Sequence, residues 1–177
     1  KVYKCPIRNR PISESVDGTK LIVPSNAVNL KNAGRITHES SMSRAILKRM
    51  QFLGVYRNIN LSDPMPIQPG IVDQKRANIE GKQVQPSRQE DQDYTIYECY
   101  CELDLKGFEH TDEDDNVTGL PLPYIVTIEE GSRQVLEIRR NWDEEDENQA
   151  AQIPFVLFPY STGLSRIYGS GLGQMGG

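Results

Sequence analysis

The acidic stretch 109–115 is the first place where residue types and spacing could hold a metal ion. Asp112, Asp114 and Asn116 have the one-three-five spacing of the oxygen ligands in an EF-hand calcium loop. Such a loop also needs Gly at its sixth position and a bidentate Glu at its twelfth, where this chain has Val and Pro. We therefore interpret the stretch as a solvated turn.

A zinc site is the second metal chemistry that the residue types allow. Cys99 and Cys101 are two residues apart, and Cys5, His38 and His110 lie elsewhere in the chain. Structural zinc sites usually use CxxC turns that bring the thiolates together, whereas an i,i+2 pair in a strand lacks that geometry. The alternation of the strand instead predicts that both thiols are buried in the core. We predict no metal and no other cofactor.

Enzyme motifs are missing around the two histidines. The sequence has no GxSxG or HExxH motif, and the carboxylates around His110 favour its protonated form, which is a poor base. The Gly169–Gly173 stretch lacks the Lys-Ser or Lys-Thr pair of a phosphate-binding loop. We predict that the chain is not an enzyme. A hydrolase is the last-ranked alternative, and it requires His38 or His110 to lie beside a nucleophile.

Two charged segments are candidate contact surfaces. Arg44, Lys48 and Arg49 are predicted on one helix and could contact phosphates or a partner, but no exposed aromatic residues accompany them for base stacking. The alternative is a solvated helix face. An acidic run follows Trp142 and could contact a basic partner; like-charge repulsion predicts that it is an extended, hydrated loop. The run consists of Asp143, Glu144, Glu145, Asp146 and Glu147.

Charge is distributed unevenly along the chain. Residues 1–58 carry 11 Lys and Arg against 3 Asp and Glu, a net charge of +8. Residues 59–177 carry 9 against 22, a net charge of −13. If the two surfaces point in different directions, identical copies could meet head to tail. The alternative is two solvated faces.

One helix and several strands must position these residues. Periodicity predicts a helix over Met42–Leu53 that Gly54 ends. Its predicted buried face consists of Met42, Ala45, Ile46, Met50 and Leu53. Alternation predicts a strand over Tyr94–Leu105, with Tyr97, Cys99, Cys101, Leu103 and Leu105 facing the core and an acidic opposite face.

A hairpin and a long irregular segment complete the predicted fold. Apolar runs on either side of Glu130-Gly131 predict a β-hairpin, and Ile153–Phe158 predicts a last strand. Residues 62–93 are rich in Pro and Gln, which predicts a loop or linker, with a short helix over Val72–Ile79 as an option. We predict an α+β fold, mostly antiparallel sheet, with one clear helix and a long irregular loop.

The 177 residues suit one domain, and the chain starts without Met and stops at Gly-Gly, so we expect a piece of a longer protein. No apolar run is long enough to span a membrane, and no signal peptide is recognisable. The three cysteines suit a reducing compartment. We expect a soluble single domain, 1–177, made in the cytoplasm.

Short pieces along most of the chain resemble the portal proteins, or head-to-tail connectors, of short-tailed bacteriophages and their prophage relatives. The most specific are LPYIVTI, from Leu122 to Ile128, and LEIRRNW, from Leu136 to Trp142. The others, in order, are Leu21–Pro24, Leu30 with Ala33, Arg35–His38, the helix ending near Gln51, Gly54–Arg57, Tyr97–Leu105 with Gly107–Glu109, Ile153–Phe155 and Gly163–Gly177. Residues 62–93 carry no resemblance.

The resemblance implies a structural subunit of a ring of about twelve copies at one capsid vertex, through which double-stranded DNA passes without sequence-specific contacts. It also implies a site in the virion, and terminase, scaffold or capsid, and tail-adaptor proteins as partners. By the same resemblance, this piece belongs to the body or wing of the subunit, outside the channel-lining helices. The isolated piece is expected to be a monomer or a weak oligomer, because it keeps only part of each subunit interface.

The alternative from another functional class is a free-standing regulatory domain. Its acidic loops and the 62–93 segment would bind a small ligand, a metal or a protein.

Overall fold

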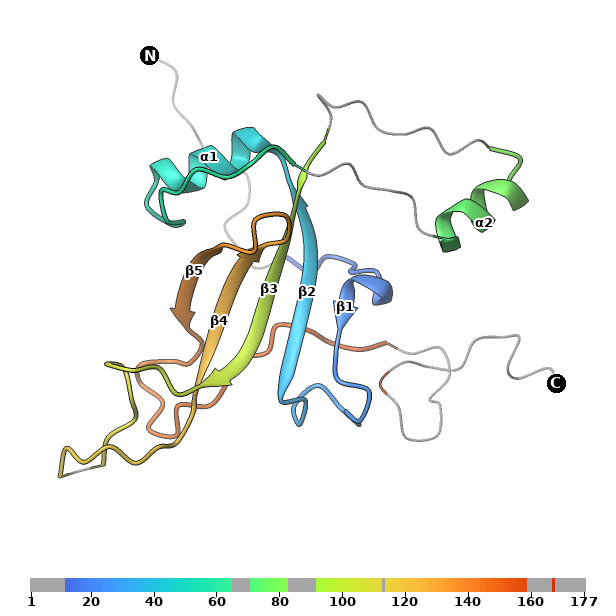
Figure 1. Cartoon of the computed structure of the whole chain (residues 1–177). Coiled ribbons are helices and arrows are strands. Elements are labelled where there is room, and N and C mark those ends of the chain that lie inside the picture. The colour runs from blue at the N-terminus through green and yellow to red at the C-terminus, as the bar shows by residue number, and fades with distance from the viewer. Residues whose placement is uncertain (1–11, 65–70, 83–91, 113, 159–166, 168–177) are drawn as a thin grey trace, which may run out of the picture.

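The protein forms one antiparallel sheet with short helices around it. The computed structural model describes residues 12–64, 71–82, 92–112, 114–158 and 167. Five strands form the sheet in the order β1-β2-β3-β4-β5, which is also their order along the chain (Figure 1). The strands are β1 Leu21–Ile22, β2 Arg35–Met42, β3 Tyr94–Leu103, β4 Leu122–Glu129 and β5 Val135–Arg140. The predicted α+β fold with a mostly antiparallel sheet is confirmed.

The predicted β-hairpin is confirmed and consists of the antiparallel strands β4 and β5. β4 is apolar on both faces and is buried along almost its whole length, because it lies between β3 and β5. The turn between the two strands is organised by the carboxylate of Glu129, which is only 3% exposed. It accepts hydrogen bonds from the backbone N–H of Gly131 (2.8 Å), the backbone N–H of Ser132 (2.7 Å) and the Ser132 hydroxyl.

Two hydrophobic clusters pack against one face of the sheet. The first surrounds Ile36 and Tyr100 and includes side chains of the 23–33 segment and the half-buried Phe155. The second surrounds Ile96 and Leu136 and includes Leu47 of the helix α1. The core is therefore divided between the two ends of the sheet.

The α1 helix runs from Arg44 to Phe52 and lies across the end of the sheet where β2 stops (Figure 1). The Ser43 hydroxyl caps it, and Gly54 follows with a φ of 75°, so the predicted stop is confirmed. The predicted buried face is only partly correct: Met42 and Met50 pack against the second hydrophobic cluster, but Leu47, which was not predicted, is the buried residue of α1. Ala45, Ile46 and Leu53 are exposed instead.

The predicted strand parity of β3 is also wrong. Tyr94, Ile96 and Tyr100 are buried, whereas Cys99 and Cys101 on the opposite face are half-buried. Both sets of residues alternate along β3. The set with Ile96 and Tyr100 is the buried one, because α1 and the 153–155 segment cover its face of the sheet. Glu98 therefore lies on the core-facing side of the sheet.

Two irregular regions differ from the prediction. Within the 62–93 segment, the α2 helix spans Ile71–Ile79, so the short-helix option is confirmed there, while 65–70 and 83–91 lie outside the described residues. The predicted strand over Ile153–Phe158 is wrong, because this segment forms no strand. Instead, Ile153 and Phe155 pack against the first hydrophobic cluster.

Candidate interaction surfaces

The basic residues predicted on the helix do lie on α1, but they are not equivalent. Arg44 forms an ion pair with Asp63, and this hydrogen bond is the main cause that raises the pKa of its guanidinium. Lys48 and Arg49 are exposed and are the part of the predicted surface that can meet a partner. The charge of Arg44 is already matched within the molecule.

Large apolar side chains beside these cations were not recognised as surface residues from the sequence. Phe52 is 90% exposed, Leu53 64%, Ile46 46% and Val55 45%. All four belong to α1 or to the turn that follows it. Helical periodicity could not separate them from the buried Leu47, because this helix has apolar residues around most of its circumference.

The acidic run is mostly exposed, as predicted for a hydrated loop, but it folds into turns, so the predicted extended course is wrong. The Asp143 carboxylate accepts the backbone N–H of Glu145 at 3.1 Å. The Asp146 carboxylate accepts the N–H groups of Asn148 (3.0 Å) and Ala150 (3.1 Å), and these bonds lower its pKa. Each aspartate satisfies local backbone donors, which offsets the repulsion within the run.

An open groove of about 610 Å³ lies between the 107–111 loop and the 140–149 segment. We call it the aromatic groove, because Phe108, Tyr124 and Trp142 line it. The Tyr124 and Trp142 rings meet edge to face, with centroids 5.6 Å apart, and the guanidinium of Arg140 lies 5.6 Å from the Trp142 ring centroid. The groove joins segments about 35 residues apart, a proximity that sequence patterns do not reveal.

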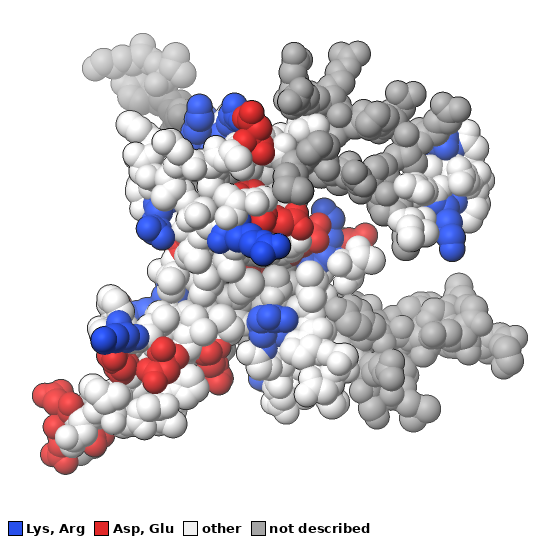
Figure 2. All heavy atoms as spheres, viewed as in Figure 1, with Lys and Arg blue, Asp and Glu red and all other residues white. Residues whose placement is uncertain are grey.

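Two carboxylates and one cation, Arg140, line the aromatic groove. Glu109 and Glu144 line it directly, and the acidic run continues on the same side. In Figure 2, red spheres gather at the end of the molecule where the 104–121 loop projects, while blue spheres lie over α1 at the other end. The separation is partial, because Asp63 pairs with Arg44 of α1, while Arg35 of β2 and Arg140 of β5 lie at the loop end of the sheet.

The EF-hand-like spacing serves a turn. The Asp112 carboxylate accepts the backbone N–H groups of Asn116 (2.8 Å) and Asp114 (3.0 Å), and the first of these bonds is the main cause that lowers its pKa. Among the described residues, no three His, Cys, Asp or Glu side chains are grouped so that they could hold a metal ion.

The cysteines of β3 are free thiols on the face opposite the two hydrophobic clusters. The Thr37 hydroxyl donates a hydrogen bond to the sulfur of Cys99, with 3.6 Å between the oxygen and the sulfur. Burial is the main cause that raises the pKa of Cys101. Cys5, the third member of the predicted set, lies outside the described residues.

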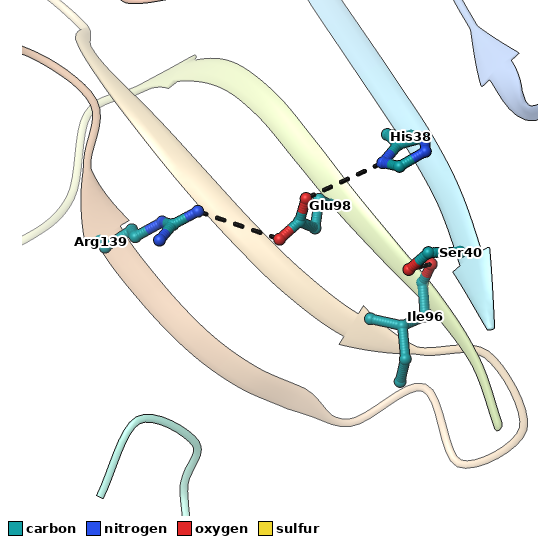
Figure 3. Close-up of polar contacts among 5 residues, drawn as sticks. All are labelled: His38, Ser40, Ile96, Glu98 and Arg139. Atoms are coloured by element: carbon teal, nitrogen blue, oxygen red, sulfur yellow. Dashed lines mark hydrogen bonds and ion pairs between the residues drawn. The ribbon is translucent and has the colours of Figure 1, made fainter. Parts of the chain in front are cut away.

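A row of polar side chains crosses the core-facing side of the sheet between the two hydrophobic clusters, and Figure 3 shows His38 and Glu98 of this row with Arg139. Glu98 is its centre: its carboxylate lies 3.9 Å from His38 Nδ1 and 3.9 Å from Arg139 Nη2. Glu137 lies on β5 in the same row, and burial raises the pKa of its carboxyl. The ring of Phe155 packs edge to face against that of His38, with the two ring centroids 5.6 Å apart.

Thr127 occupies the middle of this row, between Glu98 and Glu137 in strand register. Its side chain is fully buried, and its hydroxyl has no hydrogen-bond partner in the described part of the chain. A buried hydroxyl without a partner costs free energy, so this position lowers stability.

The hydroxyls near the two histidines are used in structural contacts. Ser40 follows His38 on the same side of β2 and donates to the backbone oxygen of Ile96 at 3.5 Å. His110 Nδ1 lies 2.8 Å from the Thr118 hydroxyl, which also donates to the His110 backbone oxygen at 3.3 Å. The contact between His110 and Thr118 closes a short turn, within which Thr111 and Val117 form an isolated antiparallel β-bridge.

Comparison with known proteins gives no relative to which the chain can be assigned: no family model, no curated protein and no solved structure matches it. Neither helix of the described residues has the length and hydrophobicity that crossing a bilayer requires.

Proposed function

We propose that this chain is a structural module of a bacteriophage or prophage portal subunit. In this role it forms part of the body of a ring at one capsid vertex, through which double-stranded DNA enters and leaves. Terminase, capsid or scaffold proteins and tail adaptors are the partners of such a ring. The module has no catalytic role and supplies shape and contacts between subunits.

The observation that carries the proposal is the resemblance of LPYIVTI and LEIRRNW to portal sequences. These residues belong to β4, which is buried along almost its whole length, and to the edge strand β5, where Leu136 is fully buried, with the first residues after it. A resemblance located in two paired strands of the sheet concerns the fold itself rather than a surface motif. The other matching pieces include residues of β1, β2 and β3.

The distribution of charge supports the same role. Identical subunits in a ring meet through two different surfaces of the same molecule. Here the cations Lys48 and Arg49 lie at the α1 end and the acidic loops at the opposite end. Opposite charges on the two surfaces favour head-to-tail contact over contact of like surfaces.

The test is the assembly state of the protein encoded by the complete reading frame. Native mass spectrometry and negative-stain images of the same sample should give closed rings of about a dozen copies with an axial hole. A monomer or dimer at every salt concentration would rule out the portal role.

The second candidate, a ligand-binding regulatory domain, is favoured by the aromatic groove with its acidic rim. A ligand that binds the folded state raises the melting temperature. The portal proposal predicts no change in melting temperature with millimolar Ca²⁺ or Zn²⁺. A saturable increase that is lost in Glu109→Gln or Glu144→Gln would instead support the regulatory domain.

A further inference from the structure

The end of α1 carries an exposed apolar projection that nothing in the described chain covers. We call Phe52, Leu53 and Val55 the α1 knob; they are 90%, 64% and 45% exposed. Lys48 and Arg49 lie beside them on the same helix and are also exposed. Contiguous exposed apolar residues with a polar rim are typical of contact sites. A partner for the knob therefore needs accessible apolar side chains and negative charge.

The aromatic groove offers accessible aromatic side chains and two carboxylates, within an open lining that is mainly polar and also includes Arg140. Phe108 is 60% exposed and Trp142 is half-buried, so aromatic surface is accessible in the groove. The hydroxyl of the buried Tyr124 donates to the Phe108 backbone oxygen at 3.3 Å, which links the groove wall to β4. Its volume of about 610 Å³ is ample for a phenylalanine side chain. Glu109 and Glu144 supply the negative charge.

The two surfaces lie at opposite ends of the same sheet. α1 covers the end where β2 stops and β3 begins, whereas the groove forms where β3 and β5 stop and β4 begins (Figure 1). The knob of one molecule therefore cannot enter its own groove. A second copy can supply either surface, and repeated contacts of this type produce a ring or an open filament.

We propose that the α1 knob of one copy docks into the aromatic groove of the next, with Lys48 and Arg49 facing Glu109 and Glu144. This inference rests on the proposed ring and identifies one of its subunit contacts. Phe52 is the central apolar residue, and the charge pairs at the rim fix orientation. A knob of three side chains makes a small contact, so the 177-residue chain alone should associate weakly, with Kd of about 0.1–1 mM.

Two variants that each block one surface test the contact. Phe52→Asp removes the knob and leaves the groove, while Phe108→Lys combined with Glu144→Lys blocks the groove and leaves the knob. All three positions are exposed, so both proteins should fold, and circular dichroism should give melting temperatures within about 3 °C of the original chain. Ile79→Asp, at a position 87% exposed on α2, is the matched control.

Sedimentation velocity from about 20 µM to 1 mM gives the readout. The original chain and Ile79→Asp should associate with increasing concentration, and each blocked variant alone should stay monomeric. An equal mixture of the two blocked variants should form one-to-one dimers, because one intact knob and one intact groove remain. Association of either blocked variant alone, no association in the mixture, or a monomeric original chain at 1 mM would overturn the inference.

The ring and the contact can fail independently. If the complete protein forms rings that Phe52→Asp leaves intact, the contact is wrong and the portal role stands. If the mixture of blocked variants pairs but the complete protein forms no ring, the contact stands and the portal role is wrong.

Discussion

Replacing the buried Glu129 by Ala should destabilise the β4–β5 hairpin more than any other single change in its turn. The carboxylate is 3% exposed and accepts three hydrogen bonds, two from backbone N–H groups and one from the Ser132 hydroxyl. A hydrogen bond to a charged group contributes about 1.5–3 kcal/mol, and water that enters the space left by the side chain can partly replace the carboxylate. We expect the free energy of unfolding to fall by about 2–4 kcal/mol.

Urea unfolding followed by far-UV circular dichroism measures the loss. Glu102→Ala is the matched control, because Glu102 is an exposed glutamate of β3, and its change should stay within about 0.5 kcal/mol. Glu129→Gln keeps one acceptor oxygen and should lose about half as much as Glu129→Ala. A loss below about 0.5 kcal/mol for Glu129→Ala would refute the view that this carboxylate organises the turn.

Four further predictions concern stability. Leu136→Ala should cost about 2–5 kcal/mol in urea unfolding, since Leu136 is fully buried, and a cost below about 1 kcal/mol would contradict its place in the core. Gly54→Ala should lower the free energy of unfolding by about 1 kcal/mol, because φ of Gly54 is 75°. Gly34→Ala, where φ is not positive, should not be destabilising. Equal melting temperatures of the two variants would contradict this prediction. Thr127→Val should leave stability unchanged or raise it by about 1 kcal/mol, and a clear loss would mean that the hydroxyl has a partner. Burial and a hydrogen bond to Glu130 raise the pKa of Tyr97 to about 12, so the stability that its neutral hydroxyl contributes is complete below pH 10 and should be lost between pH 10 and 12. The urea midpoint of Tyr97→Phe should therefore fall less steeply than that of the original chain over this pH range. Parallel curves for the two proteins would contradict the pKa of Tyr97.

The positions of the main helix and strands along the chain could be predicted from the sequence. Which face of each element is buried could not. Alternation identified β3, but Tyr94, Ile96 and Tyr100 alternate just as well as Tyr97, Cys99 and Cys101. The choice depends on which face α1 covers, which is a tertiary effect. For the same reason, the helix was found but its buried residue, Leu47, was missed.

The candidate surfaces show the same division. Lys48, Arg49 and the acidic run were recognisable by residue type, since charges rarely become fully buried. The pairing of Arg44 with Asp63 was not recognisable, because the two lie 19 residues apart. The aromatic groove requires Phe108 and Trp142 to meet across two irregular segments, and no periodic pattern encodes that approach.

The most direct test of the central claim is the mass of the intact assembly formed by the complete protein. The portal proposal predicts that native mass spectrometry gives one closed species of about a dozen copies, and that images of the same sample show a ring with an axial hole. A monomer or dimer at all salt concentrations would contradict it.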